Sequence, residues 1–427
     1  MLDIKFIREN PDIVRAAIQN KHSEPVDIDE LIKLADQRRA IGQEIDELNR
    51  AKNEAAAARD IERGKETKQE LQEAQAKHEE VEKRYVALML MLPNIPSADT
   101  PIGPDESGNK VIRDVGEKPS FGFEPKAHWD MGKDLGLIDN EKAGEVSGAR
   151  FTYLKGDLAS LQFALFEFAR KILMDQEILE DIAAQAGVSV TVTPFVPVIP
   201  PLMMRSAVMN RMARLNPIDD RFFFEKDDLV MIGSAEHTLG PLHMDEIIPD
   251  NRLPLRYFAF TPAFRREAGS YGKDTRGILR MHQFDKIEME TFTRPESGYA
   301  EQDFLVAIQE RLLQLLELPY QVVAICTGDM GKPAHRQFDM ETWMPGQKVY
   351  KETHTSDYIG GYQARRLNIR IKTENGKTEP VHMNDATAVA MGRMLAAIME
   401  NYQQEDGSIA VPKVLQSYLG KDRIMKG

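Results

Sequence analysis

Arginine and glutamate side chains recur within one stretch of the sequence, residues 264–290. Apolar residues flank its polar middle on both sides, which predicts two buried β-strands joined by a long polar loop. Arg265 and Glu267 are two residues apart, so on a strand they share a face. Glu288 and Glu290 have the same spacing on the returning strand. Such a strand pair can hold an anion and an ammonium group side by side.

Two further clusters supply groups of a similar kind. Arg393 lies at the start of an otherwise apolar helical pattern, where a buried arginine needs an anion or a carboxylate as its partner. Glu352, Thr355 and Asp357 offer the hard oxygen atoms that Mg²⁺ prefers. For each cluster alone, a structural salt bridge is the better interpretation. Several such clusters on neighbouring strands favour a site for an anion and a metal.

The elements that must position these residues lie between long helical patterns. Strands are predicted at 253–261, 280–292, 320–324, 337–343 and 363–371, and helices at 158–180, 303–316 and 387–402. Strands clustered between flanking helices indicate an α+β domain built on an antiparallel sheet. The glycine motifs of dinucleotide-binding folds and of P-loops do not occur in the sequence, so neither fold is supported.

The N-terminal part of the chain has a different pattern. Two series of apolar residues at steps of three and four, over residues 31–48 and 71–88, predict an antiparallel helical hairpin of the coiled-coil type. The pattern alone favours equally a dimerisation coiled coil and an arm that grips a partner. A segment rich in proline, glycine and serine, 93–109, reads as a linker. We therefore expect a helical arm over 1–98 and a second domain over 99–427.

The overall composition narrows the class of protein. The chain of 427 residues has one cysteine, Cys326, which rules out an internal disulfide framework and fits a reducing compartment such as the cytoplasm. The net charge of −13 argues against non-specific coating of nucleic acid. No apolar run reaches the roughly 18 residues of a membrane span, and the amphipathic N-terminus does not resemble a signal peptide.

The segment FRREAG…GKDTRGILRMHQFDKIE resembles motif 2 of the class II aminoacyl-tRNA synthetases, and specifically that of the seryl-tRNA synthetase family. The resemblance extends along the whole chain. It includes the N-terminal hairpin, the LPNIP linker, a strand ending at Pro200 and Pro201 that is similar to motif 1, and the segments SAE, CTGDMG, ETHTS, QARRLNIR and AVAMGR, the last similar to motif 3.

This resemblance implies that ATP activates serine as seryl-adenylate and that the enzyme then transfers serine to the 3′ end of tRNA(Ser). It implies that Arg265 holds the α-phosphate and the substrate carboxylate, and that Arg393 holds the γ-phosphate. Phe284 is expected to stack on adenine, and Glu267 to meet its amino edge. The implied ATP-binding residues are Arg265, Glu267, Arg280, Phe284, Glu352, Thr355 and Arg393, and the implied catalytic residues are Arg265, Arg393 and Glu288.

The resemblance also assigns the remaining groups. Glu352 and Thr355 are expected to hold Mg²⁺, and Lys273 and Arg276 to contact the tRNA acceptor end. The implied amino-acid pocket consists of Ser234, Glu236, Arg265, Glu288, Asp385 and Thr387, with Glu288 on the α-ammonium group. In this family the hairpin is an arm that reads the long variable arm of the tRNA, and the enzyme is a homodimer.

The amino-acid pocket departs from the family pattern. Ser234 stands where threonine is usual, and Asp385 where asparagine is usual. Asp357 and Tyr358 replace a Ser-Asn pair, and Gly361 replaces an acidic residue. Because an aspartate in place of asparagine removes a donor and adds a charge, two interpretations arise. Either the aspartates pair with nearby arginines such as those at 365 and 366, or the preference for serine has changed.

Two other functions compete with serine ligation to tRNA. One is a homologue that loads an amino acid onto a carrier protein, but such homologues lack the long helical arm. The other is a catalytically silent relative that binds tRNA or amino acids as a regulator. Retention of residues for both the phosphates and the ammonium group argues against a silent protein.

Overall fold

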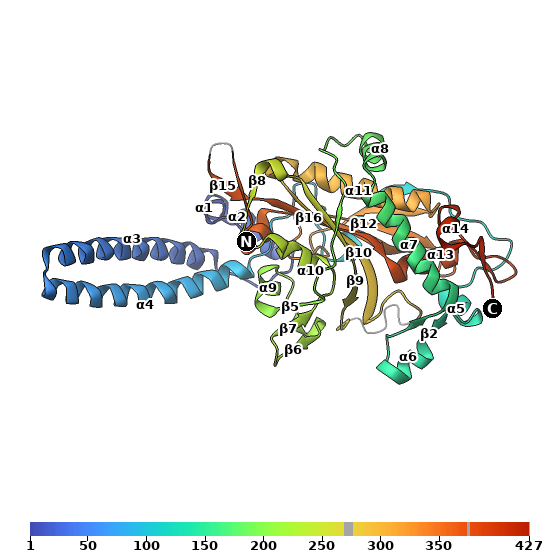
Figure 1. Ribbon diagram of the computed structural model, residues 1–427, viewed down its shortest axis with the longest axis horizontal. Coiled ribbons are helices and arrows are strands. Elements are labelled where there is room, and N and C mark those ends of the chain that lie inside the picture. The colour runs from blue at the N-terminus through green and yellow to red at the C-terminus, as the bar shows by residue number, and fades with distance from the viewer. Residues whose placement is uncertain (269–275, 374–375, 427) are drawn as a thin grey trace. The chain divides into compact units, whose positions relative to one another are not determined.

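The computed structural model describes residues 1–268, 276–373 and 376–426. Contacts between residues divide the chain into two units, Met1–Ile95 and Pro96–Gly427. Figure 1 shows the first unit as paired helices and the second as a broad sheet with helices packed against it. Within the described parts of the chain, none of the helices has the length and the apolar run that crossing a membrane requires.

The first unit consists of α1 (Ile4–Glu9), α2 (Pro11–Asn20), α3 (Ile28–Ala58) and α4 (Ile61–Met91). Aspartates begin both long helices: Asp27 accepts a hydrogen bond from the Glu30 N–H, and Asp60 accepts one from the Arg63 N–H. Arg59 adopts a left-handed conformation between them and reverses the chain. The predicted helical hairpin is confirmed.

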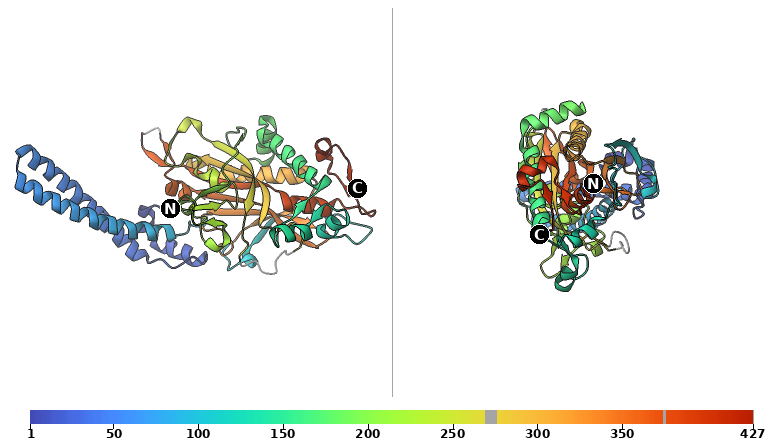
Figure 2. Two further views of the ribbon diagram at one scale, coloured as in Figure 1. Left: turned by 60° about the horizontal axis from the view of Figure 1, so that its bottom comes forward. Right: turned by 90° about the vertical axis from the view of Figure 1, so that its right-hand side faces the viewer.

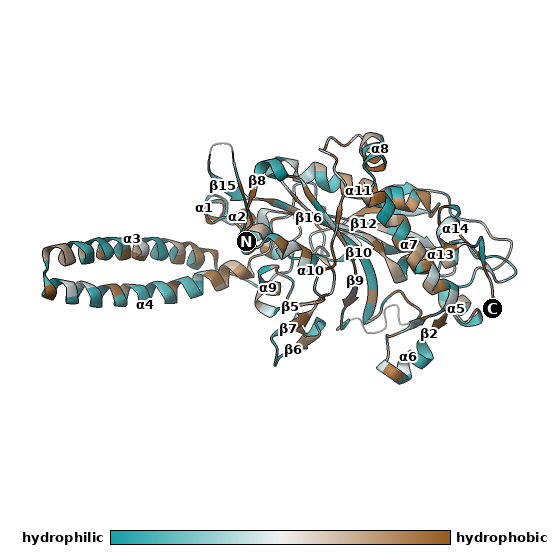
Figure 3. Cartoon of the chain, viewed as in Figure 1, coloured by the Kyte–Doolittle hydropathy of each residue, from teal (hydrophilic) through white to brown (hydrophobic). Residues whose placement is uncertain are grey.

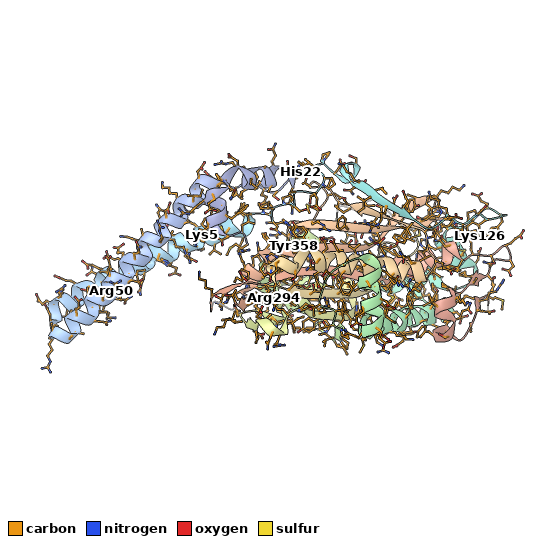
Figure 4. The ribbon with its side chains drawn as sticks, turned by 90° about the horizontal axis from the view of Figure 1, so that it is seen from above. Lys5, His22, Arg50, Lys126, Arg294 and Tyr358 are labelled. Atoms are coloured by element: carbon orange, nitrogen blue, oxygen red, sulfur yellow. The ribbon has the colours of Figure 1, made fainter. Side chains whose placement is uncertain are left out.

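The seam between α3 and α4 is narrow, as the spacing of the apolar residues predicts. Its buried residues include Leu31 and Leu34 of α3 and Leu71 of α4, whereas most other positions are exposed. Figure 3 shows the hydrophilic character of both helices, and Figure 4 shows Arg50 on this hairpin. Arg38 pairs with Glu82 across the seam. Because this pair is half exposed, it contributes less to stability than the apolar seam does.

The second unit is built on an eight-stranded sheet in the order β1-β11-β12-β13-β16-β10-β9-β4. Neighbouring strands run antiparallel, except that β4 pairs with β9 in parallel. The strands span Lys110–Val115 (β1), Tyr320–Ala324 (β11), Arg336–Met344 (β12), Val349–Gly360 (β13), His382–Ala390 (β16), Gln283–Thr293 (β10), Leu255–Phe264 (β9) and Val196–Pro197 (β4). The predicted α+β class with an antiparallel sheet is confirmed.

Helices cover this sheet and supply much of its apolar core (Figure 2). The main ones are α7 (Gly156–Met174), α8 (Gln176–Ala186), α11 (Gly298–Leu315) and α13 (Met391–Asn401). Gln309 of α11 donates hydrogen bonds to the carbonyls of Thr355 and Thr387, which lie on β13 and β16. The central strands are thereby held by polar as well as apolar contacts.

Shorter elements complete the unit. The helices are α5 (His128–Asp134), α6 (Asn140–Ser147), α9 (Ser206–Arg211), α10 (Glu236–Leu239), α12 (Gly361–Leu367) and α14 (Lys413–Leu419). The smaller sheets contain β5 (Met203–Arg205), β6 (Phe223–Phe224) and β7 (Leu229–Met231); β8 (Ile247–Pro249), β14 (Arg370–Lys372) and β15 (Thr378–Pro380); β2 (Ile138–Asp139) and β3 (Tyr153–Leu154); and β17 (Ile409–Ala410) and β18 (Arg423–Ile424).

Three local predictions are wrong. The segment predicted as a strand at 363–371 begins as helix α12, which ends at Asn368 in a left-handed conformation. The helix predicted to begin at residue 387 begins at Met391, because the preceding residues belong to β16. The predicted helix at 158–180 is two helices, because Asp175 ends α7 and caps α8.

One buried ion pair ties the sheet to α11. Arg256 of β9 donates from Nε and Nη2 to the two carboxylate oxygens of Glu301, each at 2.7 Å, and both side chains are almost fully buried. Arg256→Met is expected to lower the free energy of unfolding by about 3–5 kcal/mol, because it leaves the Glu301 carboxylate buried and unpaired. Urea unfolding measures the loss.

The matched control removes an exposed ion pair. Arg423 contacts Asp406 at 3.0 Å with both side chains largely exposed. Arg423→Met should therefore change the free energy of unfolding by less than about 1 kcal/mol. If both variants lost a similar amount of unfolding free energy, the buried Arg256–Glu301 pair would contribute no more to stability than the exposed pair.

Candidate active site

A cavity of about 300 Å³ opens at the centre of the sheet. It is bordered by β10, β13 and β16, by the start of α13 and by the segment that follows β9. Most of the residues predicted for the site line it: Glu236, Arg265, Glu267, Arg280, Phe284, Glu288, Glu352, Thr355, Asp385, Thr387 and Arg393. Residues as far apart in the sequence as Glu236 and Arg393 therefore meet in one place.

Arg265 lies just after the end of β9, not on it as predicted. Its Nε donates to the Gly233 carbonyl at 3.1 Å, and its guanidinium carbon lies 5.3 Å from the centre of the Phe284 ring. Burial, and then the charge of Arg393, lowers the pKa of Arg265. Two arginines in a partly enclosed cavity make this end a site for an anion.

Arg393 reaches the cavity from α13. Its Nη1 donates to a carboxylate oxygen of Glu352 at 2.6 Å and to the Glu352 carbonyl at 3.0 Å. The Thr355 hydroxyl donates to the same carboxylate oxygen of Glu352 at 3.3 Å. Although burial alone raises the pKa of Glu352, Arg393 holds it below its ordinary value. An ionised carboxylate beside a hydroxyl is a donor set that fits Mg²⁺.

Glu267 and Arg280 close another side of the cavity. Their side chains form an ion pair with an Nη1–Oε2 distance of 2.6 Å. Glu267 adopts a positive φ of 53°, so the chain turns sharply after β9. This turn explains why the predicted strand, with Arg265 and Glu267 on one face, is wrong. The pair lies near Phe284, the first aromatic residue of β10.

Gly277 holds the returning end of the polar loop. It has a φ of +73°, and a Cβ there would lie 2.1 Å from His128 Nε2. His128 accepts a hydrogen bond from the Ile278 N–H at 3.3 Å through that nitrogen, while its Nδ1 contacts Glu400 of α13 at 2.8 Å. This buried histidine, which has no recognisable sequence signal, fixes Ile278 at the cavity wall.

The opposite end of the cavity is rich in carboxylates. Carboxylate oxygens of Glu236, Glu288 and Asp385 lie within 4.8 Å of one another, and all three side chains are buried. Lys286 of β10 forms an ion pair with Glu288. Burial, and then the charge of Arg265, lowers the pKa of Lys286 to about 8. This end can bind an ammonium group.

Arg214 lies beside the aspartates, and the sequence alone did not indicate it. Its Nε lies 2.7 Å from Glu236, and its Nη2 lies 3.5 Å from Asp357 and 3.8 Å from Asp385. It comes from the segment after α9, outside any motif. The pairing with Arg365 or Arg366 that the sequence suggested stays a prediction. Arg366 donates to the carbonyls of residues 210 and 211.

The departures at 357 and 358 lie on different faces of β13. Asp357 lines the cavity. The Tyr358 hydroxyl, by contrast, shares a hydrogen bond of 2.6 Å with His382 Nδ1, and the Tyr358 ring packs against the Tyr299 ring. Successive side chains of a strand alternate between faces, which explains the separation. Figure 4 shows Tyr358 within the sheet unit. Of the two replacements, Asp357 is therefore the one that changes the cavity.

Two predicted residues, Ser234 and Arg276, do not line this cavity. Ser234 is buried at 2% exposure, and among the described residues its hydroxyl has no hydrogen-bond partner. Arg276 lines a separate cavity with Trp129 and Gly277. Lys273 lies outside the described residues. The predicted contacts of Arg276 and Lys273 with the acceptor end stay predictions.

Comparisons with known proteins agree with this geometry. A family model described as the tRNA synthetase class II core domain (G, H, P, S and T) matches residues 222–402, which contain most of the cavity. A second, described as the seryl-tRNA synthetase N-terminal domain, matches residues 1–96.

Proteins that align over nearly the whole chain point to the same family. The serine--tRNA ligase of Bacillus subtilis is 38% identical over 447 aligned residues that cover 100% of both chains. A crystal structure of seryl-tRNA synthetase from Pyrococcus horikoshii complexed with ATP matches with a TM-score of 0.87 at 35% identity, covering 100% of each chain. A cytoplasmic serine-tRNA ligase from Naegleria fowleri in complex with AMP matches with a TM-score of 0.85 at 28% identity, covering 100% of this chain and 99% of that one.

The largely antiparallel sheet and the two arginines at one end of its cavity lie in a class II tRNA synthetase core, which the family model identifies. With the matching N-terminal unit and the full-length relatives, the chain belongs to the seryl-tRNA synthetase family. The resemblance stated from the motifs is confirmed.

Proposed function

We propose that this protein uses ATP to activate serine as seryl-adenylate and then transfers serine to the 3′ end of tRNA(Ser). The observation that carries the proposal is the single cavity, which has two arginines at one end and buried carboxylates at the other. An amino acid can therefore place its carboxylate at the arginine end and its ammonium group at the carboxylate end. The similarity to structures with bound ATP or AMP supports the nucleotide half.

The arginine end provides fixed positive charge for adenylate formation. The serine carboxylate attacks the α-phosphorus of ATP and pyrophosphate leaves, so negative charge gathers on phosphoryl oxygens. In our proposal Arg265 holds the α-phosphate and the serine carboxylate, and Arg393 holds the γ-phosphate. Phe284 stacks on adenine, whose amino edge meets Glu267, and the Arg280 pair keeps Glu267 in place.

Glu352 and Thr355 are the residues that would hold Mg²⁺. The ion, when bound, supplies positive charge to the phosphates. Glu352 also orients Arg393 through their 2.6 Å contact. One carboxylate thereby couples the position of the arginine to that of the metal.

At the carboxylate end Glu288 binds the α-ammonium group of serine, with Glu236, Asp385 and Thr387 around it. In the second step the terminal ribose hydroxyl of the tRNA attacks the adenylate carbonyl, and AMP leaves. This step needs no side-chain nucleophile. Arg276 and Lys273 meet the acceptor end.

We further propose that residues 1–98 form the tRNA-binding arm and 99–427 the catalytic domain. The near balance of positive and negative residues in α3 and α4 suits recognition of tRNA by its shape and phosphates. The protein acts as a homodimer in the cytoplasm, as proposed from the family resemblance.

ATP–pyrophosphate exchange over a panel of amino acids, followed by aminoacylation of tRNA(Ser), tests the function. We expect exchange with serine above every other natural amino acid. Absence of exchange with any amino acid would overturn the ligase proposal and favour a silent tRNA-binding or amino-acid-binding regulator. Exchange without transfer to tRNA would favour a carrier-loading enzyme.

A further inference from the structure

The amino-acid end of the cavity holds more negative than positive groups. The ionisable side chains that contact one another there are the carboxylic acids of Glu236, Glu288, Asp357 and Asp385 and the cations of Arg214 and Lys286. If all are charged, four negative charges face two positive charges and leave two negative charges unmatched. Such an excess is costly in a largely buried site. An amino-acid substrate supplies one positive charge through its ammonium group, so one more is needed.

Asp385 is the carboxyl with the weakest cation contact in this group. Lys286 pairs with Glu288, and Arg214 lies closer to Glu236, at 2.7 Å, than to Asp385, at 3.8 Å. Asp385 is also buried at 5% exposure. Its backbone is directly opposite that of Asp357 in the β13–β16 pairing. Of the four acids, Asp385 therefore gains least from being ionised.

Acidic groups face Asp385 from three elements. Glu236 comes from α10, Glu288 and Glu290 from β10, and Asp357 from β13, and Glu290 is opposite Asp385 in the β10–β16 pairing. The positive groups are Arg214 and Lys286. His237, next to Glu236, adds no charge at neutral pH, because burial lowers its pKa to about 4. Burial, and then Glu236, raises the pKa of Glu290 well above its ordinary value, which disfavours a further negative charge at this place.

A carboxylate oxygen of Glu236 and one of Asp385 lie within 4.8 Å of each other, and both side chains are buried. Two carboxyl groups this close in a buried site ionise less readily together than one of them alone, and Arg214, at 2.7 Å from Glu236 and 3.8 Å from Asp385, favours the ionised form of Glu236 more strongly. Burial first, and then Glu236 and Asp357, raises the pKa of Asp385 well above its ordinary value. Although burial alone raises the pKa of Glu236, Arg214 holds it well below its ordinary value. Of the two carboxyls, Asp385 is therefore the better place for a proton, and Glu236, which is closer to Arg214, is the better acceptor.

We propose that Asp385 keeps a proton shared with Glu236, and that this neutral carboxyl selects a substrate with a hydroxyl side chain over one with a second ammonium group. The inference rests on the proposed function and identifies its specificity-determining residue. The α-ammonium group and the shared proton together balance the two excess negative charges. A diamino acid would instead displace the proton and pair with an ionised Asp385.

A neutral carboxyl and a side-chain amide are close in size and in hydrogen-bonding capacity. The protonated acid has one donor and acceptor oxygens, and the amide has donors and one acceptor. Asp385→Asn therefore fixes the neutral state at every pH. Asp385→Ala removes both hydrogen-bonding groups, and Arg214 acts as a positioning residue that keeps Glu236 as the acceptor.

The test is ATP–pyrophosphate exchange with serine and with 2,3-diaminopropionate between about pH 6 and 8.5, using the full chain. In the wild type, at pH values above the apparent pKa of the Glu236–Asp385 pair, the KM for serine should rise by up to about tenfold per pH unit. The KM for ATP should change little over the same range. In Asp385→Asn this rise should disappear, whereas Asp385→Ala should raise the KM for serine about tenfold or more at every pH. Thermal unfolding confirms that both variants are folded.

Each outcome decides the proposal. A KM for serine that is flat with pH in the wild type, with exchange intact, would overturn the shared proton and leave the ligase function standing. A wild type that prefers 2,3-diaminopropionate to serine would overturn the selection of a hydroxyl side chain. Exchange with neither amino acid at any pH would overturn both the proposal and the serine ligase function.

Discussion

Arg265→Met should lower kcat/KM for seryl-adenylate formation by at least about 10³-fold. Removing a single fixed donor from a charge-stabilising site costs about 10²–10³-fold, and an arginine supplies both charge and paired donors. Arg265 is already oriented, by the Gly233 carbonyl at 3.1 Å and by the Phe284 ring. Its charge therefore needs no rearrangement when the phosphoryl oxygens become more negative. Pyrophosphate exchange at saturating serine measures the loss.

The matched control is the adjacent arginine. Arg266 is exposed, and its guanidinium carbon lies 5.9 Å from the centre of the Phe222 ring, outside the cavity. Arg266→Met should leave exchange within about threefold of the wild type, since exposed charges act weakly through solvent. Arg265→Lys separates charge from geometry, because lysine keeps the charge without the planar pair of donors. An Arg265→Met enzyme with near wild-type exchange would remove this residue from the proposed mechanism.

At the arginine end of the cavity, the residues that lie together were largely predictable from the sequence, whereas their roles stay predictions. Arg265, Phe284, Glu352 and Arg393 lie in motifs where residue type and spacing are both informative, and all four line the cavity. Their local structure was harder to predict. The sharp turn at Glu267 depends on a positive φ, which local propensity does not favour for glutamate. Tertiary contacts therefore override the strand pattern at that point.

At the carboxylate end, the residues that lie together were less predictable from the sequence. Arg214 comes from an irregular segment, and its position beside Glu236 and Asp385 arises only when α10, β13 and β16 come together. A lone arginine in the irregular segment after α9 carries no periodic signal. The same holds for His128, whose partners are Ile278 and Glu400. Residues that act by closing long-range contacts leave no pattern in a single sequence.

Segment 361–371 shows why an alternation of apolar residues can predict the wrong secondary structure. Its alternating arginine, leucine and isoleucine residues match a strand, yet α12 occupies Gly361–Leu367. Gln363, Ala364 and the following arginines are good helix formers, and Gly360 at φ +60° ends β13 and reverses the chain. Only Arg370–Lys372 is extended, in a small sheet with β8 and β15. A short apolar alternation thus predicts the wrong element when a glycine turn precedes it.

Glu288→Gln should raise the KM for serine by about 10²-fold or more, because removing one partner of a buried charge pair costs about 3 kcal/mol or more. Glu288 is 1% exposed, pairs with Lys286 and lies within 4.8 Å of both Glu236 and Asp385. The glutamine keeps the size of the side chain but cannot balance either Lys286 or the substrate ammonium group. The KM for ATP should change far less, since the nucleotide contacts lie at the arginine end. Pyrophosphate exchange with each substrate varied in turn measures both constants.

Glu288→Asp is the comparison that separates charge from shape. It retains the carboxylate one methylene further from the ammonium group, so its KM for serine should fall between those of the wild type and Glu288→Gln. The pKa of Lys286, already lowered to about 8 by burial and by Arg265, should fall further once its carboxylate partner is gone. Raising the pH should then neutralise Lys286 and recover part of the stability of Glu288→Gln, but none of its affinity for serine. Equal rises in the KM for serine and for ATP in Glu288→Gln would instead assign Glu288 a general structural role.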